Sequence, residues 1–339
     1  MDEIEEMRNT MNSFNTLLDN KIVLITGGTG SFGHAFADRI LSLSSTVTII
    51  IYSRDEYKQY LMAQEYQTYK NLKRLRFVIG DVRNRDALVN ACRGVDYIIH
   101  AAALKQVPTC EDNIQEAILT NINGALNVKY AAEANGIKRI VALSTDKAVQ
   151  PINLYGATKM VSDKVFTDTS EETSMVSCIV RYGNVASSRG SVIPFFIKRH
   201  KEGLHDYPIT DIRMTRFWIS LEEAVQMALI ALKDAVGGET FVAKLPSFFI
   251  TDLVKAIDPD GQIDVVGIRP GEKIDELMIT KFDVEKTVDF GKYYVIYPTV
   301  ELAKSAGYPL VDREFEYSSN KNDRWLDIDE IKTLLMKWK

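Results

Sequence analysis

Short apolar runs alternate with segments of helical periodicity through the first half of the chain. The apolar runs predict strands at 22–25, 47–53, 75–79, 97–100, 139–144 and 176–181. Between them, helical segments are expected over 86–92, 113–135 and 155–169. Such alternation is typical of a parallel sheet covered by helices on both faces. We therefore predict an α/β fold with a doubly wound parallel sheet.

The pattern changes near Asn184, where loops lengthen and prolines, arginines and aromatic residues form short clusters. Later helices are expected over 220–235, 251–257 and 325–338. A chain of 339 residues is long enough for two domains. We predict an extension over 1–20, a sheet domain over 21–183 onto which 217–245 packs back, and a smaller C-terminal domain formed by 184–216 and 246–339.

Composition and charge argue against several classes of protein. The net charge is −5 with both signs interspersed, so no basic stripe indicates a nucleic-acid partner. No apolar stretch approaches the roughly 18 residues of a membrane span, and the acidic, polar start does not resemble a secretory signal. Cys92, Cys110 and Cys178 have neither disulfide nor metal-site spacing, and buried packing is favoured over a catalytic role. We expect a cytoplasmic protein without a metal.

The first predicted strand runs directly into a glycine-rich turn, Gly27-Gly28-Thr29-Gly30-Ser31-Phe32-Gly33. Glycines let the backbone turn tightly and approach a pyrophosphate, and a helix that begins near Ser31 points its free N–H groups at it. A purely structural turn is the alternative. In the alternating pattern, the turn predicts a Rossmann-type sheet that binds a dinucleotide through Gly27, Thr29, Gly30, Ser31, Phe32 and Gly33.

The second strand ends in Ser53-Arg54, about 20 residues after the glycine turn, where this fold reaches the adenosine ribose. An acidic residue there would favour NAD through the ribose 2′-hydroxyl. Serine and arginine instead suit a 2′-phosphate, so we predict NADP as the cofactor. The alternative is NAD: the acidic Asp55 follows directly, and Arg54 could be only a solvated charge in a turn.

Two further strand ends add candidate cofactor contacts. Asp81, next to Val82, follows the third strand, where its carboxylate could accept from the adenine amino group. Ala101 and Ala103 follow the fourth strand, where small residues let the backbone approach the cofactor closely. Packing at a helix start is the alternative for the alanines.

Candidate catalytic residues follow the fifth strand. Tyr155 and Lys159 share one helix face, so an ammonium and a nicotinamide cation could lower the pKa of the phenol and let it remove a hydroxyl proton. Thr145 could hydrogen-bond the same substrate oxygen. Asp146 and Lys147 add an acid and a base, although adjacent charges in a loop are often only a surface pair.

The glycine turn and the Tyr155–Lys159 pair resemble the extended short-chain dehydrogenase/reductase superfamily. Longer blocks resemble its inverting UDP-N-acetylglucosamine 4,6-dehydratases, from about Lys21 to the end. These blocks are Tyr52–Glu56, His100–Pro108, Ser144–Lys147 with Pro151, Asn153 and Tyr155–Lys159, Arg181–Val185, Ser188–Pro194, Thr210–Asp211 with Arg213–Trp218, and Arg269–Lys273. The extension is longer than the family needs, and Lys201–Tyr207 is only loosely similar.

The resemblance implies a UDP-sugar as substrate and a homo-oligomer as the assembly. It points to substrate contacts by Lys105, Asn184, Val192, Arg216, Arg269 and Glu272. A guanidinium fork matches phosphate oxygens, which suits Arg216 and Arg269 to the diphosphate. Surface pairs of Arg216 with Asp211 and of Glu272 with Lys273 are the alternatives.

The implied reaction is a dehydration with internal redox. Tyr155, with Lys159 and Thr145, takes the O4 proton as C4 is oxidised; Lys147 removes the C5 proton, and Asp146 protonates the departing 6-hydroxyl. Reduction at C6 and reprotonation of C5 from the opposite face complete it. This chemistry needs a neutral Lys147 and a protonated Asp146. A 4-epimerase, a retaining dehydratase and a non-enzymatic NADP sensor remain as alternatives.

Overall fold

The computed structural model describes residues 12–169, 174–186 and 191–336. Within them, a nine-stranded sheet runs in the order β13-β14-β9-β6-β5-β4-β1-β2-β3. Seven strands from β3 to β9 are parallel, and β14 and β13 add an antiparallel edge. The bounds are β1 Ile22–Thr26, β2 Thr48–Ser53, β3 Leu75–Ile79, β4 Tyr97–His100, β5 Arg139–Leu143, β6 Val176–Arg181, β9 Thr240–Ala243, β13 Thr287–Asp289 and β14 Tyr293–Ile296. The predicted doubly wound α/β fold is confirmed.

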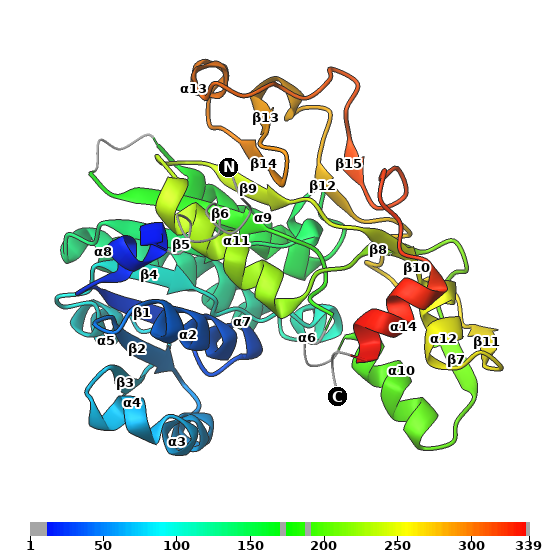
Figure 1. The fold of residues 1–339 in the computed structure, drawn as a ribbon, viewed down its shortest axis with the longest axis horizontal. Coiled ribbons are helices and arrows are strands. Elements are labelled where there is room, and N and C mark those ends of the chain that lie inside the picture. Colours follow the sequence, from blue (N-terminus) through cyan, green and yellow to red (C-terminus); the bar gives the residue numbers. More distant parts are fainter. Residues whose placement is uncertain (1–11, 170–173, 187–190, 337–339) are drawn as a thin grey trace.

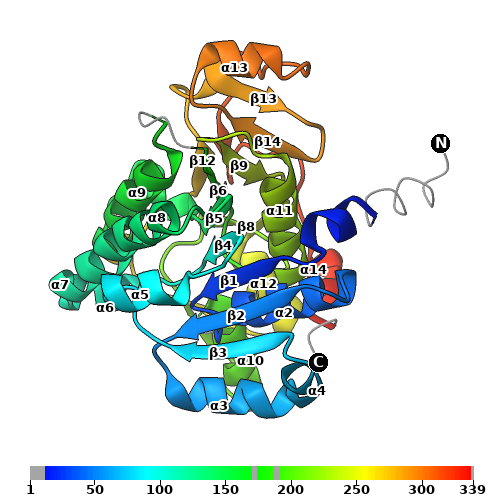
Figure 2. The same ribbon diagram turned by 90° about the vertical axis from the view of Figure 1, so that its left-hand side faces the viewer.

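Helices cover both faces of this sheet (Figure 2). One face carries α5 (Arg85–Ala91), α8 (Gly124–Ala134) and α9 (Leu154–Thr167), and the other carries α2 (Ser31–Leu43) and α11 (Leu221–Asp234). Successive strand side chains point to opposite faces, so Leu24 packs in one core cluster while Val23 and Ile25 pack in the other. Strands buried on both faces explain the continuous apolar runs of the sequence.

The predicted extension is described only from residue 12, where a short helix over 12–18 begins. Phe14 and Leu18 are buried in the core cluster that also holds α2 and α11. The side chain of Asp19 accepts a hydrogen bond from Ser44 at 2.6 Å. Residues 12–19 are therefore packed against the sheet domain, while 1–11 lie outside the described residues.

A smaller unit lies beside the carboxyl ends of the parallel strands (Figure 1). Its own core contains Ile193, Phe196, Tyr207, Trp218 and Leu253. It is built from α10 (Val192–Lys201), β7 (Asp206–Ile209), β8 (Thr215–Phe217), β10 (Ser247–Phe249), α12 (Ile250–Ile257), β11 (Gln262–Val265) and α14 (Ile328–Met336).

The predicted domain limits need one correction. Residues 246–339 were all assigned to the smaller domain, yet β14 and β13 extend the central sheet next to β9. Segment 217–245 supplies α11 and β9 to the sheet domain.

The remaining elements are α3 Glu56–Glu65, α4 Gln67–Asn71, α6 Val107–Asp112, α7 Ile114–Ala117, the π-helix η1 Ile118–Asn123, the 3₁₀ turns η2 Asp146–Ala148 and η3 Val284–Lys286, β12 Leu277–Ile279, α13 Val300–Ser305 and β15 Tyr317–Ser318.

None of the helices described is long and apolar enough to cross a membrane. Cys92, Cys110 and Cys178 are all free and buried, as expected for packing residues.

Candidate active site

A cavity of about 1240 Å³ opens between the carboxyl ends of the parallel strands and the smaller unit. Every predicted site residue except Asp146 lines it. From the dinucleotide set these are Gly27, Thr29, Gly30, Ser31, Phe32, Gly33, Ser53, Arg54, Asp81, Val82, Ala101 and Ala103; from the catalytic set, Thr145, Lys147, Tyr155 and Lys159; from the substrate set, Lys105, Asn184, Val192, Arg216, Arg269 and Glu272. Residues 188–190 of the block that supports the resemblance lie outside the described part of the chain.

The glycine turn is too close to its neighbours for side chains. Gly27 has a φ of +65°, and a Cβ on it would lie 2.9 Å from the backbone of Ala102. A Cβ on Gly33 would lie 2.3 Å from the carbonyl oxygen of Gly28. The helix α2 begins at Ser31 and points its N-terminus at this turn. The cradle therefore fits a pyrophosphate held by backbone N–H groups.

The adenosine end combines basic and acidic side chains. Ser53 is buried at the end of β2, where Gln59 donates to its hydroxyl at 3.1 Å. Arg54 is 56% exposed and lies 3.9 Å from Asp81. Lys58, which the sequence did not single out, also lines the cavity and pairs with Asp55 at 2.8 Å.

The carboxylates of this region are already engaged. Asp55 caps α3 by accepting from the backbone of Lys58. Asp81 accepts from Arg83 at 2.6 Å, and although burial opposes its charged form, Arg83 holds the pKa of this carboxyl below its usual value. Neither acid is a free ribose acceptor, which leaves Arg54 as the exposed charge at the end of β2.

A second loop is held against the glycine turn by hydrogen bonds. The Thr26 hydroxyl accepts from the backbone of Ala101 and Ala102, and it lies 2.8 Å from Nδ1 of His100. Farther along, the Asn121 side chain both accepts from and donates to the backbone of Leu104. Asn121 lies in the π-helix η1, a rare element often found at functional sites.

Anchoring of Leu104 holds the adjacent Lys105 at the cavity. Burial lowers the pKa of the Lys105 ammonium. No hydrogen bond or ion pair joins this side chain to another described residue. Lys105 is thus a cation available to an anionic ligand.

Tyr155 and Lys159, which the sequence predicts as a catalytic pair, both lie on α9, as their spacing indicates. Asn153 caps this helix by accepting from the backbone of Gly156 at 2.7 Å. Lys159 donates to the carbonyl of Leu143 at 2.8 Å, and burial lowers the pKa of its ammonium. Burial raises the pKa of Tyr155 to about 12, against the opposing effects of Lys147 and a hydrogen bond with Thr145. The protein alone therefore does not give the lowered phenol pKa that the sequence predicted, and a nicotinamide cation would act in the opposite direction to burial.

Lys147 lies between two carboxylates. Its Nζ is 3.1 Å from Oδ1 of Asp146, 3.1 Å from Oε1 of Glu276 and 3.1 Å from Oδ1 of Asn184. Asp146 comes from the same 3₁₀ turn, whereas Glu276 precedes β12. Glu276 lines the cavity, and sequence reasoning missed it although it stands three residues after the Arg269–Lys273 block.

Asp146 is closed off from the cavity. Its side chain is 1% exposed, and Oδ1 accepts from Thr145 Oγ1 at 2.8 Å as well as from Lys147. The other oxygen, Oδ2, has no hydrogen-bond partner among the described residues. Direct contact of this carboxyl with a ligand is therefore not available in this conformation.

Burial and neighbouring charges shift the pKa values of Asp146, Lys147 and Glu276. Burial and the charge of Glu276 raise the pKa of Asp146, which favours its protonated form. Burial opposes the charged forms of Lys147 and Glu276, but in both residues the neighbouring charges have the larger effect. The two carboxylates raise the pKa of Lys147. Lys147 and Arg216 together lower the pKa of Glu276. The raised pKa of Asp146 is in the direction that the predicted chemistry needs, whereas the raised pKa of Lys147 is in the opposite direction.

Arg216 connects this cluster to the rest of the cavity. Its side chain is 8% exposed, and its guanidinium lies 3.5 Å from Glu276 and 3.9 Å from Glu272. Asp211 pairs with Arg213 at 2.6 Å instead. Lys273 donates to the carbonyl of Val149. The two surface pairs considered from the sequence are therefore not formed.

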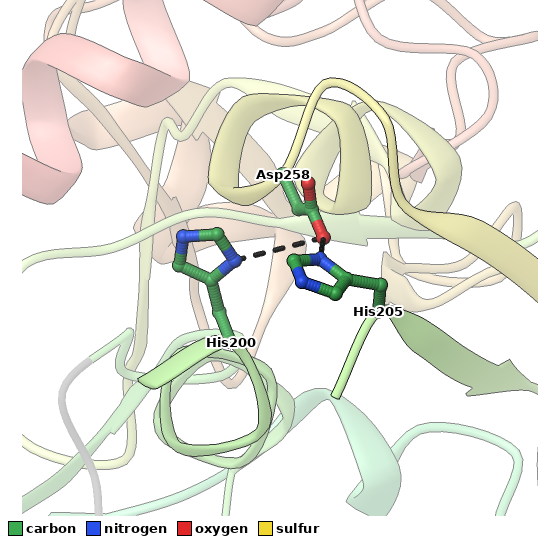
Figure 3. A group of neighbouring side chains, drawn as sticks. All are labelled: His200, His205 and Asp258. Carbon is green, nitrogen blue, oxygen red and sulfur yellow. Dashed lines mark hydrogen bonds and ion pairs between the residues drawn. The ribbon is translucent and has the colours of Figure 1, made fainter. Parts of the chain in front are cut away.

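A group with metal-ligating chemistry lies outside this cavity (Figure 3). Oδ2 of Asp258 is 2.7 Å from Nδ1 of His205, 3.6 Å from Nδ1 of His200 and 3.0 Å from the Tyr207 hydroxyl. The hydrogen bond from His205 holds the pKa of Asp258 below its usual value. These contacts satisfy the buried carboxylate without an ion, and they tie the end of α10 to β7 and α12.

Comparison with known proteins agrees with the site. The model of a family described as polysaccharide biosynthesis protein matches residues 23–298. The chain belongs to this family. It is 45% identical to a UDP-N-acetylglucosamine 4,6-dehydratase (inverting) of Campylobacter jejuni subsp. jejuni serotype O:2, over 93% of this chain and 97% of that protein. A UDP-glucose 4-epimerase of Rickettsia canadensis is 41% identical over 94% and 96%. The predicted resemblance to the inverting dehydratases is confirmed.

Solved structures share the same fold. Pen from Bacillus thuringiensis is 33% identical with a TM-score of 0.84, covering 95% of this chain and 99% of that one. The dTDP-glucose 4,6-dehydratase DesIV from Streptomyces venezuelae, solved with NAD bound, is 22% identical with a TM-score of 0.65 over 75% and 86%.

Proposed function

We propose that this protein is an inverting UDP-N-acetylglucosamine 4,6-dehydratase that uses NADP. The observation that carries this proposal is the position of Lys147, a base candidate that lines the same cavity as Tyr155 and the glycine turn. The relatives include dehydratases and epimerases, so overall identity supports the sugar-nucleotide class more than the reaction. A base for C5 is needed only by the dehydratase.

The cavity fits a nicotinamide dinucleotide along its sheet side. Gly27, Gly33 and the N-terminus of α2 would hold the pyrophosphate. Arg54 and Lys58 are the cations at the ribose, and Asp55 is already occupied, which supports a 2′-phosphate. When bound, the nicotinamide supplies a hydride acceptor at C4 and a hydride donor at C6.

The chain's own groups then move protons. Tyr155 takes the O4 proton, with Thr145 hydrogen-bonded to it and Lys159 anchored on the strand below. Lys147 takes the C5 proton, which the new 4-ketone makes acidic. Because Asp146 is shielded, its proton reaches the departing 6-hydroxyl through Thr145 or Lys147, its two hydrogen-bond partners. Asp146 is thus proposed as an indirect acid rather than a direct one.

The opposite wall supplies groups for the diphosphate and uridine. Lys105 and Arg269 line the cavity and form no ion pair with other described residues. Either cation can therefore bind a phosphate without breaking an existing ion pair. Arg216 is held beside Glu272 and Glu276. We propose that these cations bind the diphosphate, with Asn184, Val192 and Glu272 completing the contacts.

The helix pair α8 and α9 supports the predicted homo-oligomer. Leu126 and Tyr130 on α8 are 50% and 49% exposed, and Met160 and Val161 on α9 are exposed as well. The two helices lie side by side (Figure 2), and large exposed apolar side chains on neighbouring helices are typical of an interaction surface. Light scattering on the protein and on Leu126→Glu tests whether a second copy packs here.

The free, buried cysteines fit the proposed reducing cytoplasm.

One assay tests the reaction. Purified protein is incubated with UDP-N-acetylglucosamine and NADP, and the product is analysed by mass and NMR. A product lighter by one water with inverted C5 is expected. An epimer of unchanged mass would support the 4-epimerase, and an unchanged C5 would support the retaining dehydratase.

A further inference from the structure

Glu276 is the second carboxylate of the Lys147 cluster and has no part in the proton transfers described above. Its side chain is 3% exposed, yet it lines the cavity. Oε1 lies 3.1 Å from Lys147 and 3.5 Å from Nε of Arg216, while Oε2 has no hydrogen-bond partner among the described residues. A buried carboxylate oxygen without a partner costs free energy unless it takes a proton or meets a donor.

The backbone of Glu276 is held firmly. Its N–H donates to Ser319 Oγ at 2.8 Å, and its carbonyl accepts from the backbone of Ser319 at 2.8 Å. The Ser319 hydroxyl also lies 2.6 Å from that of Thr215, which directly precedes Arg216. Glu276 and Arg216 are therefore held by one network, so their side chains face each other in a defined arrangement.

Arg216 is both a partner of Glu276 and a proposed ligand of the substrate diphosphate. The guanidinium donates to the carbonyls of Ile274 and Lys273 at 2.8 and 3.0 Å and so stays in place. A phosphate beside it therefore adds negative charge near the Glu276 carboxylate and weakens the stabilisation of its charged form. The negative charges of Glu276 and the diphosphate then compete for the same cation. Binding of substrate thus changes the balance between Glu276 and Lys147, whose Nζ is its other partner.

We propose that Glu276 is a positioning residue that takes a proton from Lys147 when the substrate diphosphate engages Arg216, leaving Lys147 neutral to act at C5. This inference rests on the proposed dehydratase function. It accounts for how a lysine held between two carboxylates can become a base.

The proton count closes for the elimination, and the proton later added at C5 balances the one that Tyr155 takes from O4. An N–H bond of the Lys147 ammonium breaks and an O–H bond forms on Glu276 Oε1. The freed nitrogen pair takes the C5 proton, the C5 electrons move toward the C4 carbonyl, and the 6-hydroxyl leaves as water with the Asp146 proton. Lys147, 3.1 Å from both acids, then passes a proton to Asp146 and regains one from Glu276.

The test separates oxidation at C4 from proton loss at C5. Glu276→Gln keeps the shape and an oxygen for Lys147 but cannot take a proton. Single turnovers in deuterated buffer should show C4 oxidation within about threefold of wild type, while deuterium enters C5 about a hundredfold more slowly at pH 7, a general-base effect. That slow exchange should rise with pH, since solvent hydroxide can then deprotonate Lys147.

Two variants serve as controls. Glu276→Asp keeps a carboxylate that can take the proton, so the pH profile of its C5 exchange should match that of wild type whatever its absolute rate. Glu285→Gln removes the same charge from an exposed position on the turn after β12 and should match wild type throughout.

Three outcomes would overturn the assignment: C5 exchange in Glu276→Gln as fast as wild type or faster, an equal loss of oxidation and exchange, or a pH profile in Glu276→Asp that differs from that of wild type. Wild type is the reference for the reaction itself. If wild type releases no water and places no deuterium at C5, the proposed function fails. If wild type does both and Glu276→Gln behaves alike, only the role of Glu276 fails.

Discussion

Nζ of Lys147 lies 3.1 Å from Oε1 of Glu276, although the two residues are 129 positions apart in the chain. Lys147 follows a strand of the central sheet, and Glu276 precedes the short strand β12 that pairs with β15. The base candidate is thus held jointly by two distant parts of the chain. Its charge and orientation depend on their relative placement, and a ligand in the cavity between them can alter both.

Tyr155→Phe should remove the first proton acceptor and keep the ring in place. The rate of C4 oxidation should fall by a general-base factor of ~10²–10⁴, with substrate affinity little changed. Stopped-flow absorbance of the reduced nicotinamide measures this step, and titration calorimetry with UDP-N-acetylglucosamine measures binding. Near-normal oxidation in the variant would exclude Tyr155 as the base.

Lys147→Ala should spare oxidation and block elimination. Reduced cofactor should accumulate in a single turnover with little dehydrated sugar, and deuterium from solvent should no longer enter C5. Tyr155→Phe is the matched contrast, because it should show no such accumulation. An alanine variant that exchanges C5 as fast as wild type would remove Lys147 from the mechanism.

Local patterns predicted the parts of the site that local structure determines. Tyr155 and Lys159 share one face because they are four positions apart on a helix, and the glycine turn follows from the strand before it and the helix after it. Glu276 could not be predicted in this way, because its partner comes from 129 positions away and the pairing depends on tertiary packing. Lys58 was missed for a simpler reason: the dinucleotide-binding pattern points to the residues at the end of β2, whereas the cavity continues onto the first turn of α3.

The structure differs from two expectations, and the pattern of strands and helices in the sequence could not have predicted either difference. Asp146 was expected to face the substrate, yet the 3₁₀ turn directs its carboxylate toward Thr145 and Lys147 and away from the cavity. The strands β13 and β14 are only three and four residues long, and their sequence does not say which sheet they join. Pairing with β9 decides it, and that partner is distant in the chain.

Gly27→Ala tests the close approach at the phosphate turn. Alanine at a φ of +65° costs about 1–2 kcal/mol in unfolding free energy, and the new Cβ would also lie 2.9 Å from the backbone of Ala102. Gly136→Ala is the matched control, because Gly136 has the same φ with nothing within 4 Å of its Cβ. Chemical denaturation should show a larger loss for Gly27→Ala, and only that variant should lose cofactor binding. Equal losses would mean that Ala102 imposes no limit.

Cofactor preference gives a test that is independent of the sugar chemistry. Arg54→Asp replaces an exposed cation at the end of β2 with a charge that repels a 2′-phosphate and can accept from a 2′-hydroxyl. Affinity for NADP should therefore fall by about tenfold or more, and affinity for NAD should hold or rise, since one lost charge-assisted contact is worth about 1.5–3 kcal/mol.

Lys58→Gln should lower the affinity for NADP by a smaller factor than Arg54→Asp does, because Lys58 is also paired with Asp55. Its affinity for NAD should not change. Lys70→Asp reverses a charge on the neighbouring exposed helix α4, outside the cavity, and should leave both affinities unchanged. Fluorescence titration of each variant with the two cofactors measures the ratio directly. Because Asp55 and Asp81 are already paired with Lys58 and Arg83, neither can take over the ribose contact in wild type without losing its partner. A wild-type protein that binds NAD as tightly as NADP would show that Arg54 and Lys58 do not serve a 2′-phosphate.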